Sequence, residues 1–234
     1  MLRATLTKYF GSSDKSQFKK SWSQSGEDLI VKYIFDVIGI HQPTYMDIGA
    51  HHPFYLNNTA LFYENGSRGI NIEPDPVLIK AFIAHRKEDV NLNIGISDQK
   101  SVLDFYIINN PVLNTFSRQE AENYHKEGDY HIVEQKKISV DTVNAVLTEY
   151  RQGKFPDFLT IDAEGIDEIV LKSIDFSANF PAVICVETIS FSNSGMGKKN
   201  LELIEFLKSR DYILYADTNI NSIFVRRERW ERQP

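Results

Sequence analysis

The sequence predicts an α/β fold in which helices cover both faces of a mostly parallel sheet, and three features support this. Strand-like and helix-like segments alternate from about residue 24 to the end of the chain. Most strand-like runs are continuously apolar, as in parallel sheets buried on both faces. The last two, "YILYA" and "SIFVRR", are separated only by "DTNIN", which indicates a hairpin and one antiparallel strand. Together these features predict a doubly wound, three-layer, Rossmann-like sandwich.

The individual elements follow from apolar periodicity and from turn signals. In the first helix, "EDLIVKYIFDVI", Ser25 and Asp28 have the spacing of a capping box. One face of this helix is predicted to carry Leu29, Ile30, Tyr33, Ile34, Val37 and Ile38. The predicted strands are "TYMDI", "GINI", "LNIGI", "FLTI" and "AVICVE". Further helices are predicted at about 58–65, 76–87, 141–150 and 165–173 and over "NLELIEFLKSR", with Asn57 or Asn58 capping the first of them.

One segment, at about 98–140, interrupts this alternation. Its runs "VLDFYII" and "HIVEQKKISV" predict extra strands on either side of a polar insertion, which we expect to hold or cover a substrate. Within it, residues 114–128 are expected to form a wall or lid, with Asn114, Thr115 and Tyr124 placed to bind sugar hydroxyls. A plain surface helix is the alternative after Ser117. We expect a single domain over 23–234, preceded by a basic arm over 1–22.

Composition limits the classes of function. The chain has 234 residues, 42% of them hydrophobic, and a net charge of -6, which argues against a general nucleic-acid binder. The single cysteine, Cys185, lies in an apolar run, so we expect a buried thiol in a reducing, cytoplasmic compartment. No run is long enough to span a bilayer. The basic arm is expected to be solvated, with at most weak contact with an acidic membrane surface. Nothing in the sequence indicates the oligomeric state.

The ends of two predicted strands indicate the ligand. Gly49 follows "YMDI", and the acid Glu73 lies 24 residues later at the tip of the next strand. Ligands of open α/β sheets bind at the carboxyl ends of strands, where a carboxylate bonds ribose hydroxyls, so we expect an adenosine-containing ligand. The loop "DIGAHHPFYLNN" has one glycine and thus lacks the phosphate cradle that nicotinamide and flavin cofactors need. S-adenosylmethionine has no phosphate, and Asp47 suits its cationic end, which favours a methyltransferase over a dehydrogenase.

A family resemblance adds to this interpretation. The blocks "SQSGEDL", "YMDIGAHHPFYLNNTALFYENGSRGINIEPDP", "LNIGISD", "NTFS", "FLTIDAEGIDEIVLKSIDF" and "PAVICVE" occur in this order. From about residue 22 to 226 the chain resembles the FkbM-type family of S-adenosylmethionine-dependent methyltransferases, most specifically in "DIGAHHP" and "IDAEG". The resemblance implies a class I methyltransferase fold, with a seven-stranded sheet whose last strand is antiparallel. It also implies O-methyl transfer to a sugar or a polyketide-type molecule.

The resemblance also implies roles for individual residues. It places the methionine-side loop at Asp47, Gly49 and Ala50, followed by His51. Glu73 would hold the ribose, Pro74 would lie beside the adenine, and Ser97 and Asp98 would lie near the adenine edge. Gln24, Ser25 and Glu27 would line the pocket or simply begin a helix. Thr160 stands where the family most often has a lysine, which puts a lysine-based mechanism in doubt.

Methyl transfer to a hydroxyl requires removal of a proton, by a general base or after coordination of a metal. Asp162 and Glu187 are expected at the tips of adjacent strands, with Glu164 two residues beyond Asp162. These three carboxylates could converge to bind Mg²⁺. Alternatively, one carboxylate or His52 acts alone as the base, and Glu164 stabilises the following helix.

We therefore predict an S-adenosylmethionine-dependent O-methyltransferase that acts on a hydroxyl of a sugar, glycan, nucleotide sugar or related small molecule. Two alternatives remain open. One is an NAD-dependent oxidoreductase or epimerase of nucleotide sugars. The other is a non-catalytic binding protein that keeps the fold.

Overall fold

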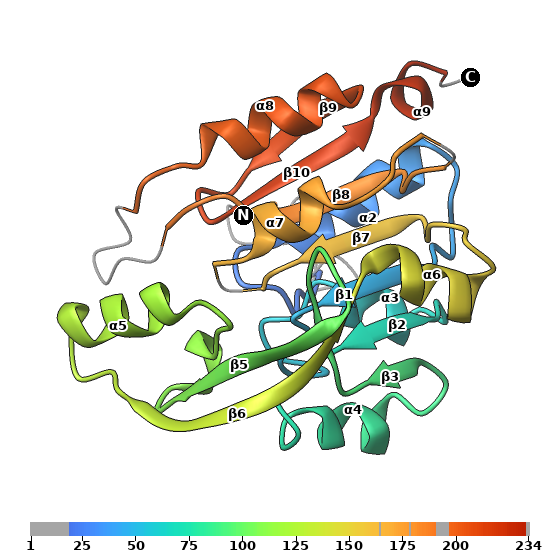
Figure 1. The fold of residues 1–234 in the computed structure, drawn as a ribbon. Helices are drawn as coiled ribbons and strands as arrows, with labels where there is room; N and C mark the ends of the chain where they lie inside the picture. The colour runs from blue at the N-terminus through green and yellow to red at the C-terminus, as the bar shows by residue number, and fades with distance from the viewer. Residues whose placement is uncertain (1–18, 164, 178, 191–196, 233–234) are drawn as a thin grey trace, which may run out of the picture.

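A seven-stranded sheet forms the centre of the molecule, in the order β3-β2-β1-β7-β8-β10-β9 (Figure 1). The computed structural model describes residues 19–163, 165–177, 179–190 and 197–232. The strands are β1 (Tyr45–Ile48), β2 (Gly69–Ile72), β3 (Val90–Leu92), β7 (Phe158–Ile161), β8 (Val183–Glu187), β9 (Tyr212–Asp217) and β10 (Asn221–Arg226). Strand β10 runs antiparallel to both of its neighbours, β8 and β9, while the other pairings are parallel. The predicted α/β class, with a mostly parallel sheet and one antiparallel strand, is confirmed.

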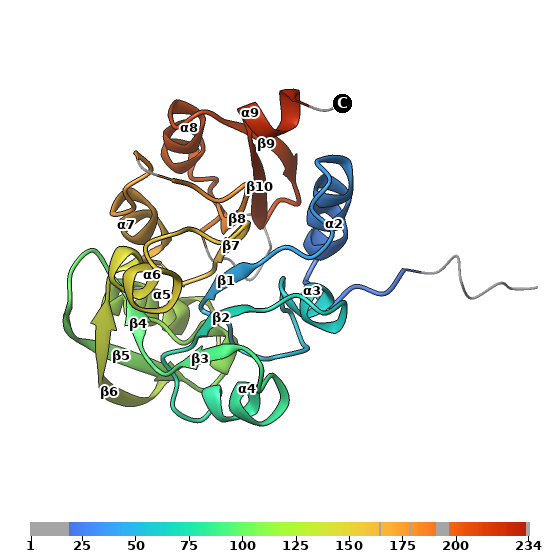
Figure 2. The same ribbon diagram turned by 90° about the vertical axis from the view of Figure 1, so that its right-hand side faces the viewer.

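Helices cover both faces of this sheet. Figure 2 shows α2 and α3 on one side and α6, α7 and α8 on the other, with α4 beside the β3 edge. Their bounds are α2 (Glu27–Val37), α3 (Ala60–Glu64), α4 (Ile79–His85), α6 (Val143–Arg151), α7 (Asp167–Lys172) and α8 (Leu201–Ser209), and the short α9 (Arg227–Glu231) follows β10. Among the described residues, none of the helices combines the length and the apolar character that crossing a bilayer requires.

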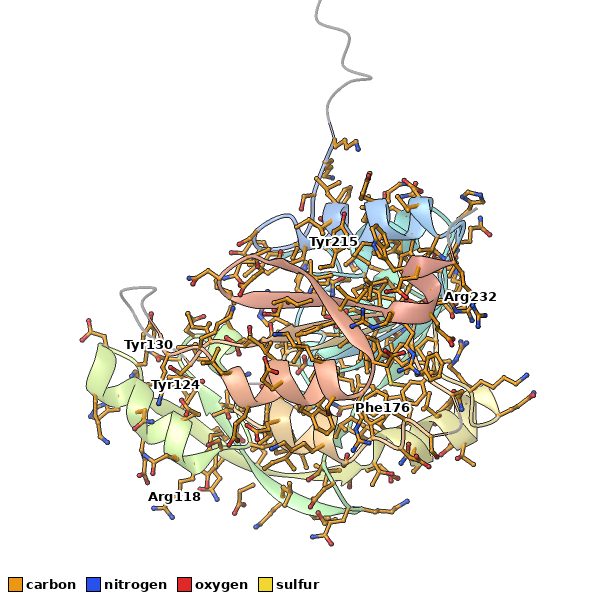
Figure 3. The ribbon with its side chains drawn as sticks, turned by 90° about the horizontal axis from the view of Figure 1, so that it is seen from above. Arg118, Tyr124, Tyr130, Phe176, Tyr215 and Arg232 are labelled. Atoms are coloured by element: carbon orange, nitrogen blue, oxygen red, sulfur yellow. The ribbon has the colours of Figure 1, made fainter. Side chains whose placement is uncertain are left out.

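The alternation of side chains along each strand separates the core into two clusters. Met46, Leu159 and Ile184 pack with α6, α7 and α8. Tyr45, Phe158 and Val183, each one residue earlier on its strand, pack with α2 and α3. Figure 3 shows one aromatic residue from each side, Phe176 of the first cluster and Tyr215 of the second. Buried Cys185 belongs to the second cluster, as expected of a structural thiol.

A second, three-stranded sheet in the order β4-β6-β5 is formed by the segment predicted as an insertion together with β4, which precedes it. Its strands are β4 (Gly95–Ile96), β5 (Ser101–Ile108) and β6 (Ile132–Asp141), and η2 (Pro111–Leu113) and α5 (Arg118–Glu127) lie between β5 and β6. The single strand predicted over "LNIGI" is wrong, because this run divides between β3 and β4 in different sheets. At the break, the Asn93 amide donates hydrogen bonds to the carbonyls of Glu73 (2.8 Å) and Pro74 (3.0 Å).

The predicted orientation of the first helix is partly wrong. Helix α2 buries Val31, Ile34 and Phe35, whereas Tyr33 is 55% exposed. Its N-cap residue, Gly26, provides no side-chain cap, so the predicted capping box does not form. Asp28 instead accepts hydrogen bonds from residues before the helix, including the Trp22 N–H at 2.7 Å, and this buried contact fixes which face turns inward. Residues 1–18 of the predicted basic arm lie outside the described residues.

Candidate functional site

A cavity of about 260 Å³ lies at the carboxyl ends of β1, β2, β7 and β8. The strand tips contribute Gly49, Glu73, Asp162 and Glu187 to its lining. Opposite these polar groups, the insertion supplies an apolar wall that includes Phe105, Pro111, Val112, Leu113 and Phe116. The cavity therefore combines a few convergent polar groups with apolar walls, as small-molecule sites do.

Glu73 is buried at the tip of β2 and is fixed by two backbone groups. Its Oε2 accepts a hydrogen bond from the His51 N–H at 2.7 Å, and its Oε1 accepts one from the Asp75 N–H at 2.8 Å. Burial raises the pKa of Glu73 to about 7, despite these two N–H groups, which favour the ionised form. Each carboxylate oxygen keeps a second lone pair with which it can accept a hydrogen bond from a ligand hydroxyl.

Gly49 brings the tips of β1 and β7 together. Its φ of 79° lies in the left-handed region, and a Cβ placed there would lie 1.8 Å from the carbonyl oxygen of Asp162. The N–H groups of Gly49 and Ala50 both donate to the Ile72 carbonyl, at 3.0 and 3.1 Å. Ala50 packs in a small apolar cluster with Ile79 and Phe82 and does not line the cavity. Of the two, only Gly49 is placed to contact a ligand.

Asp47 was expected to face the cationic end of the cofactor, but the structure turns its side chain away from the cavity. Asp47 shares its face of the sheet with Tyr45, and its Oδ2 accepts hydrogen bonds from Asn57 Nδ2 (2.9 Å) and Thr59 Oγ1 (2.8 Å). It is buried and does not line the cavity. The β-strand period of two explains this, because a side chain at this position must point toward α3.

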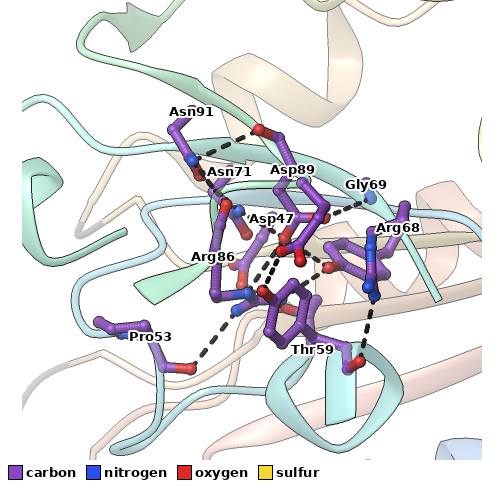
Figure 4. A network of polar contacts seen from close by, with 12 residues as sticks. Asp47, Pro53, Thr59, Arg68, Gly69, Asn71, Arg86, Asp89 and Asn91 are labelled. Carbon is purple, nitrogen blue, oxygen red and sulfur yellow. Dashed lines mark hydrogen bonds and ion pairs between the residues drawn. The ribbon is translucent and has the colours of Figure 1, made fainter. Parts of the chain in front are cut away.

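Asp47 belongs to a buried polar network that lies behind the cavity loop (Figure 4). Its centre is Arg86, which is fully buried and bonds Asp89 through Nε at 3.1 Å. Nη2 of Arg86 donates to the hydroxyls of Tyr45 (2.8 Å) and Thr59 (2.9 Å). The network therefore connects β1, the start of α3 and the end of α4, and it holds the loop after Gly49 in place.

The two histidines that follow Gly49 differ in whether they line the cavity. His51 lines the cavity, and its backbone has a φ of 53°, a conformation uncommon for a residue with a side chain. His52 does not line the cavity, and its Nδ1 accepts a hydrogen bond from the Phe54 N–H at 3.1 Å. The structure therefore gives no support to His52 as the catalytic base. Burial lowers the pKa of His51, so its imidazole is neutral near neutral pH.

Asp162 and Glu187 both line the cavity, from the ends of β7 and β8. No described residue donates a hydrogen bond to the Asp162 side chain, whereas the neighbouring Asp167 accepts one from the Ala163 N–H at 2.8 Å. Burial, followed by the negative charges of Asp167, Asp47 and Glu27, raises the pKa of Asp162. A carboxylate with this environment is suited to accept a proton near neutral pH.

The expected Mg²⁺ site receives no support. Within the described ranges, no three His, Cys, Asp or Glu side chains gather closely enough to hold a metal ion. Glu164, the third expected ligand and a catalytic candidate, lies outside those ranges. We therefore derive no step through a metal.

Gln24, Ser25 and Glu27, at the start of α2, were predicted to line the pocket, and one of them does. Gln24 lines the cavity, whereas Ser25 and Glu27 do not. The Ser25 N–H donates to Glu27 Oε2 at 2.7 Å. Fully buried Glu27 also accepts hydrogen bonds from Thr218 Oγ1 (2.7 Å) and Asn221 Nδ2 (3.2 Å). Its role is to connect the start of α2 with the β9–β10 turn, where Asn221 lines the cavity.

Of the three residues predicted to lie beside the adenine, Pro74, Ser97 and Asp98, one lines the cavity. Pro74, Gly95 and Ile96 line the cavity, but Ser97 and Asp98 do not. The Ser97 N–H donates to the Asp141 carbonyl at 2.9 Å, which directs this residue toward β6. The structure therefore brings neither Ser97 nor Asp98 to the cavity lining, and their contact with the cofactor stays a prediction.

The lid segment also differs from its prediction. Thr115 and Tyr124 are buried, at 0% and 1% exposure, so they are not available to sugar hydroxyls. Asn114 lines the cavity, but its Oδ1 accepts from the Ile108 N–H and its Nδ2 donates to Asp75 Oδ2, both at 2.9 Å. Helix α5 follows Ser117, which caps it by accepting from the Glu120 N–H at 3.2 Å.

Sequence reasoning missed the role of Asn58, which was interpreted only as a helix cap. The first turn of α3 has no side-chain cap, and Asn58 lines the cavity. Its Nδ2 donates to Thr160 Oγ1 at 3.0 Å, so the residue that replaces the family's usual lysine supports a cavity residue. Register explains the contact, because Thr160 pairs with Asp47 on β1 and shares its face.

Comparison with known proteins gives a family match. A family model described as the methyltransferase FkbM domain matches residues 47–214. Among solved structures, the chain is similar to a TehB-like SAM-dependent methyltransferase from Corynebacterium glutamicum, with a TM-score of 0.41, 11% identity, and coverage of 96% of this chain and 95% of the other. It is also similar to a Staphylococcus aureus protein provisionally named a caffeoyl-CoA O-methyltransferase, with a TM-score of 0.39, 14% identity, and coverage of 96% and 97%. The curated proteins gave no significant match.

Proposed function

The chain belongs to the FkbM methyltransferase family, and we propose that it uses S-adenosylmethionine to methylate a hydroxyl of a sugar, glycan or related small molecule. The observation that carries this proposal is that Glu73 and Asp162 line one cavity from the ends of two different strands. The single cysteine is the basis for expecting a reducing compartment such as the cytoplasm.

The residues of the cavity fit S-adenosylmethionine. Glu73 is the carboxylate available to the ribose hydroxyls, and Leu113 and Phe116 provide apolar surface suited to an adenine ring. The cofactor has a net positive charge near neutral pH, from a sulfonium and an ammonium against one carboxylate, and the cavity is acidic. When bound, it supplies a methyl group on a sulfonium, which makes that carbon electrophilic.

Asp162 is the proposed general base. Asp162 lines the cavity, and no described residue donates a hydrogen bond to its carboxylate. Burial also raises its pKa. The acceptor hydroxyl would donate its proton to Asp162 as its oxygen forms a bond to the methyl carbon, while the carbon–sulfur bond breaks and S-adenosylhomocysteine is left as the product. Glu187, at the end of the adjacent strand β8, lines the same cavity and would orient the acceptor.

The alternatives have weaker support. A nicotinamide cofactor requires a phosphate site, yet the N–H groups of Gly49 and Ala50 are already bonded to the Ile72 carbonyl. A non-catalytic binding protein would have no need of an acid in the cavity to which no described residue donates a hydrogen bond.

A methyl-transfer assay tests this proposal. The enzyme would be incubated with S-adenosylmethionine bearing a deuterated methyl group and a panel of monosaccharides, glycosides, phenols and hydroxylated lactones, with products identified by mass spectrometry and NMR. We expect O-methyl products from the wild type and at least a 100-fold lower rate from Asp162→Asn, with binding of S-adenosylhomocysteine retained. Methylation only at nitrogen or carbon, or full activity of the variant, would contradict the proposal.

A further inference from the structure

The cavity is acidic. Three carboxylates line it, those of Glu73, Asp162 and Glu187, and His51 is the only other ionisable side chain among the described lining residues. A lowered pKa leaves His51 neutral near neutral pH. None of the described lining residues is a lysine or an arginine.

Three cationic residues that are close to the cavity in the sequence or in the fold do not line it. Lys199 is close in sequence to Gly197, a lining residue, but its Nζ pairs with Asp217 Oδ1 at 2.7 Å. Arg86 lies behind the cavity loop, fully buried and paired with Asp89. Lys198 is exposed and does not line the cavity. Residues 191–196, which the structure does not describe, contain no lysine, arginine or histidine in their sequence.

Proteins recognise phosphate and carboxylate groups through arginine, lysine or free backbone N–H groups. Neither type of cationic side chain lines this cavity in the described residues, and the N–H groups of Gly49, Ala50 and His51 are already bonded. An anionic acceptor would approach Asp162 and Glu187 in a partly desolvated cavity, where repulsion between like charges is strong.

We propose that the acceptor enters this cavity as an uncharged or cationic molecule, and that phosphorylated acceptors, including nucleotide sugars and coenzyme A esters, are rejected. This inference rests on the proposed function and narrows its substrate class. Methylation would then precede attachment of a nucleotide or phosphate to the acceptor, or follow its removal.

The test uses binding and needs no knowledge of the natural acceptor. Three 5′-thioadenosines would carry, on sulfur, a three-carbon arm ending in a hydroxyl, an ammonium or a phosphate monoester. In the proposed binding mode, this arm would reach from the cofactor sulfur toward Asp162 and Glu187. Isothermal titration would measure each dissociation constant, with S-adenosylhomocysteine as the reference ligand.

We expect the phosphate-ended probe to bind at least tenfold more weakly than the hydroxyl-ended probe, and the ammonium-ended probe to bind at least as tightly. The double variant Asp162→Asn, Glu187→Gln should shrink the phosphate penalty, because it removes two negative charges. Glu205→Gln is the matched control, since its carboxylate is exposed on α8, where it pairs with Lys208, and the substitution should leave the penalty unchanged.

The outcomes distinguish a failure of the charge inference from a failure of the cofactor assignment. If S-adenosylhomocysteine binds and the phosphate-ended probe binds as tightly as the hydroxyl-ended probe, the charge inference is wrong and the proposed function stands. If neither S-adenosylhomocysteine nor any probe binds, the cofactor assignment is wrong and the inference falls with it. The comparison in the wild type is decisive even if the double variant does not fold.

Discussion

The carboxylate of Glu73 accepts a hydrogen bond from the backbone N–H of His51 at 2.7 Å, and this contact joins the tips of β1 and β2 at the edge of the cavity. It places a buried acid where an adenosine ligand needs a ribose acceptor. It also aligns the loop that carries Gly49 and His51, so the same residue serves both the fold and the site.

The raised pKa of Glu73 predicts how stability depends on pH. Its pKa is about 7 in the folded protein and roughly 4.3 in an unfolded chain, so between these values the folded state binds more protons. The free energy of unfolding of the ligand-free protein should therefore fall as pH rises from about 4.3 to 7. The loss attributable to Glu73 is on the order of 3 kcal/mol.

Urea titrations at pH 5 and pH 8 measure this effect. Glu73→Gln should show a smaller difference between the two pH values than the wild type, whereas Glu205→Gln, whose carboxylate is exposed, should behave as the wild type does. An equal pH dependence in Glu73→Gln and the wild type would show that the carboxyl is not protonated on folding.

The buried Arg86 network predicts a large effect from a residue that does not touch the cavity. Arg86→Met leaves Asp89 buried without its cation, and we expect the free energy of unfolding to fall by about 3–5 kcal/mol. Lys32→Met breaks an exposed i,i+4 pair with Asp36 and should change it by less than about 0.5 kcal/mol. Chemical denaturation of both variants makes the comparison, and similar losses would contradict the assigned role of Arg86.

Gly49 and Gly153 allow the effect of a close contact to be separated from that of backbone strain. Both have a positive φ, 79° and 75°, but an added Cβ at Gly49 meets the Asp162 carbonyl, whereas Gly153 has nothing within 4 Å. Gly153→Ala should lower the free energy of unfolding by about 1–2 kcal/mol from backbone strain alone. Gly49→Ala should lower the free energy of unfolding by about 1–3 kcal/mol more than this, because the added methyl group overpacks the contact with Asp162. It should also weaken the binding of S-adenosylhomocysteine. Thermal unfolding and titration of both variants test this, and equal behaviour would refute the close approach of β1 and β7.

Local sequence patterns predicted the strands, because continuous apolar runs are short and sharply bounded here. They also placed Gly49, Glu73, Asp162 and Glu187 correctly at strand ends, since the carboxyl ends of parallel strands share one edge of the sheet. The division of "LNIGI" between two sheets depends on Asn93 bonding to carbonyls about twenty residues earlier, which local periodicity does not report.

Where the cavity lining differs from the prediction, the cause is the direction in which a side chain points. Asp47 and Gly49 are two residues apart, yet only Gly49 lines the cavity, because Asp47 still belongs to β1 and points toward α3. Strand alternation places Asp47 beside Tyr45, so this signal was present in the sequence. His52 and Asn58 lie in an irregular loop, where no periodicity exists and only the folded geometry shows which side chain enters the cavity.

Isothermal titration of the wild type and Glu73→Gln with S-adenosylmethionine, S-adenosylhomocysteine and NAD tests whether Glu73 holds the ribose of the cofactor. We expect micromolar binding of the first two ligands to the wild type, near -8 kcal/mol, and no binding of NAD. Binding should be weakened at least tenfold, or by roughly 1.4 kcal/mol, in the variant. Binding of NAD in place of the other two ligands, or equal binding of S-adenosylhomocysteine to Glu73→Gln and the wild type, would show that this assignment is wrong.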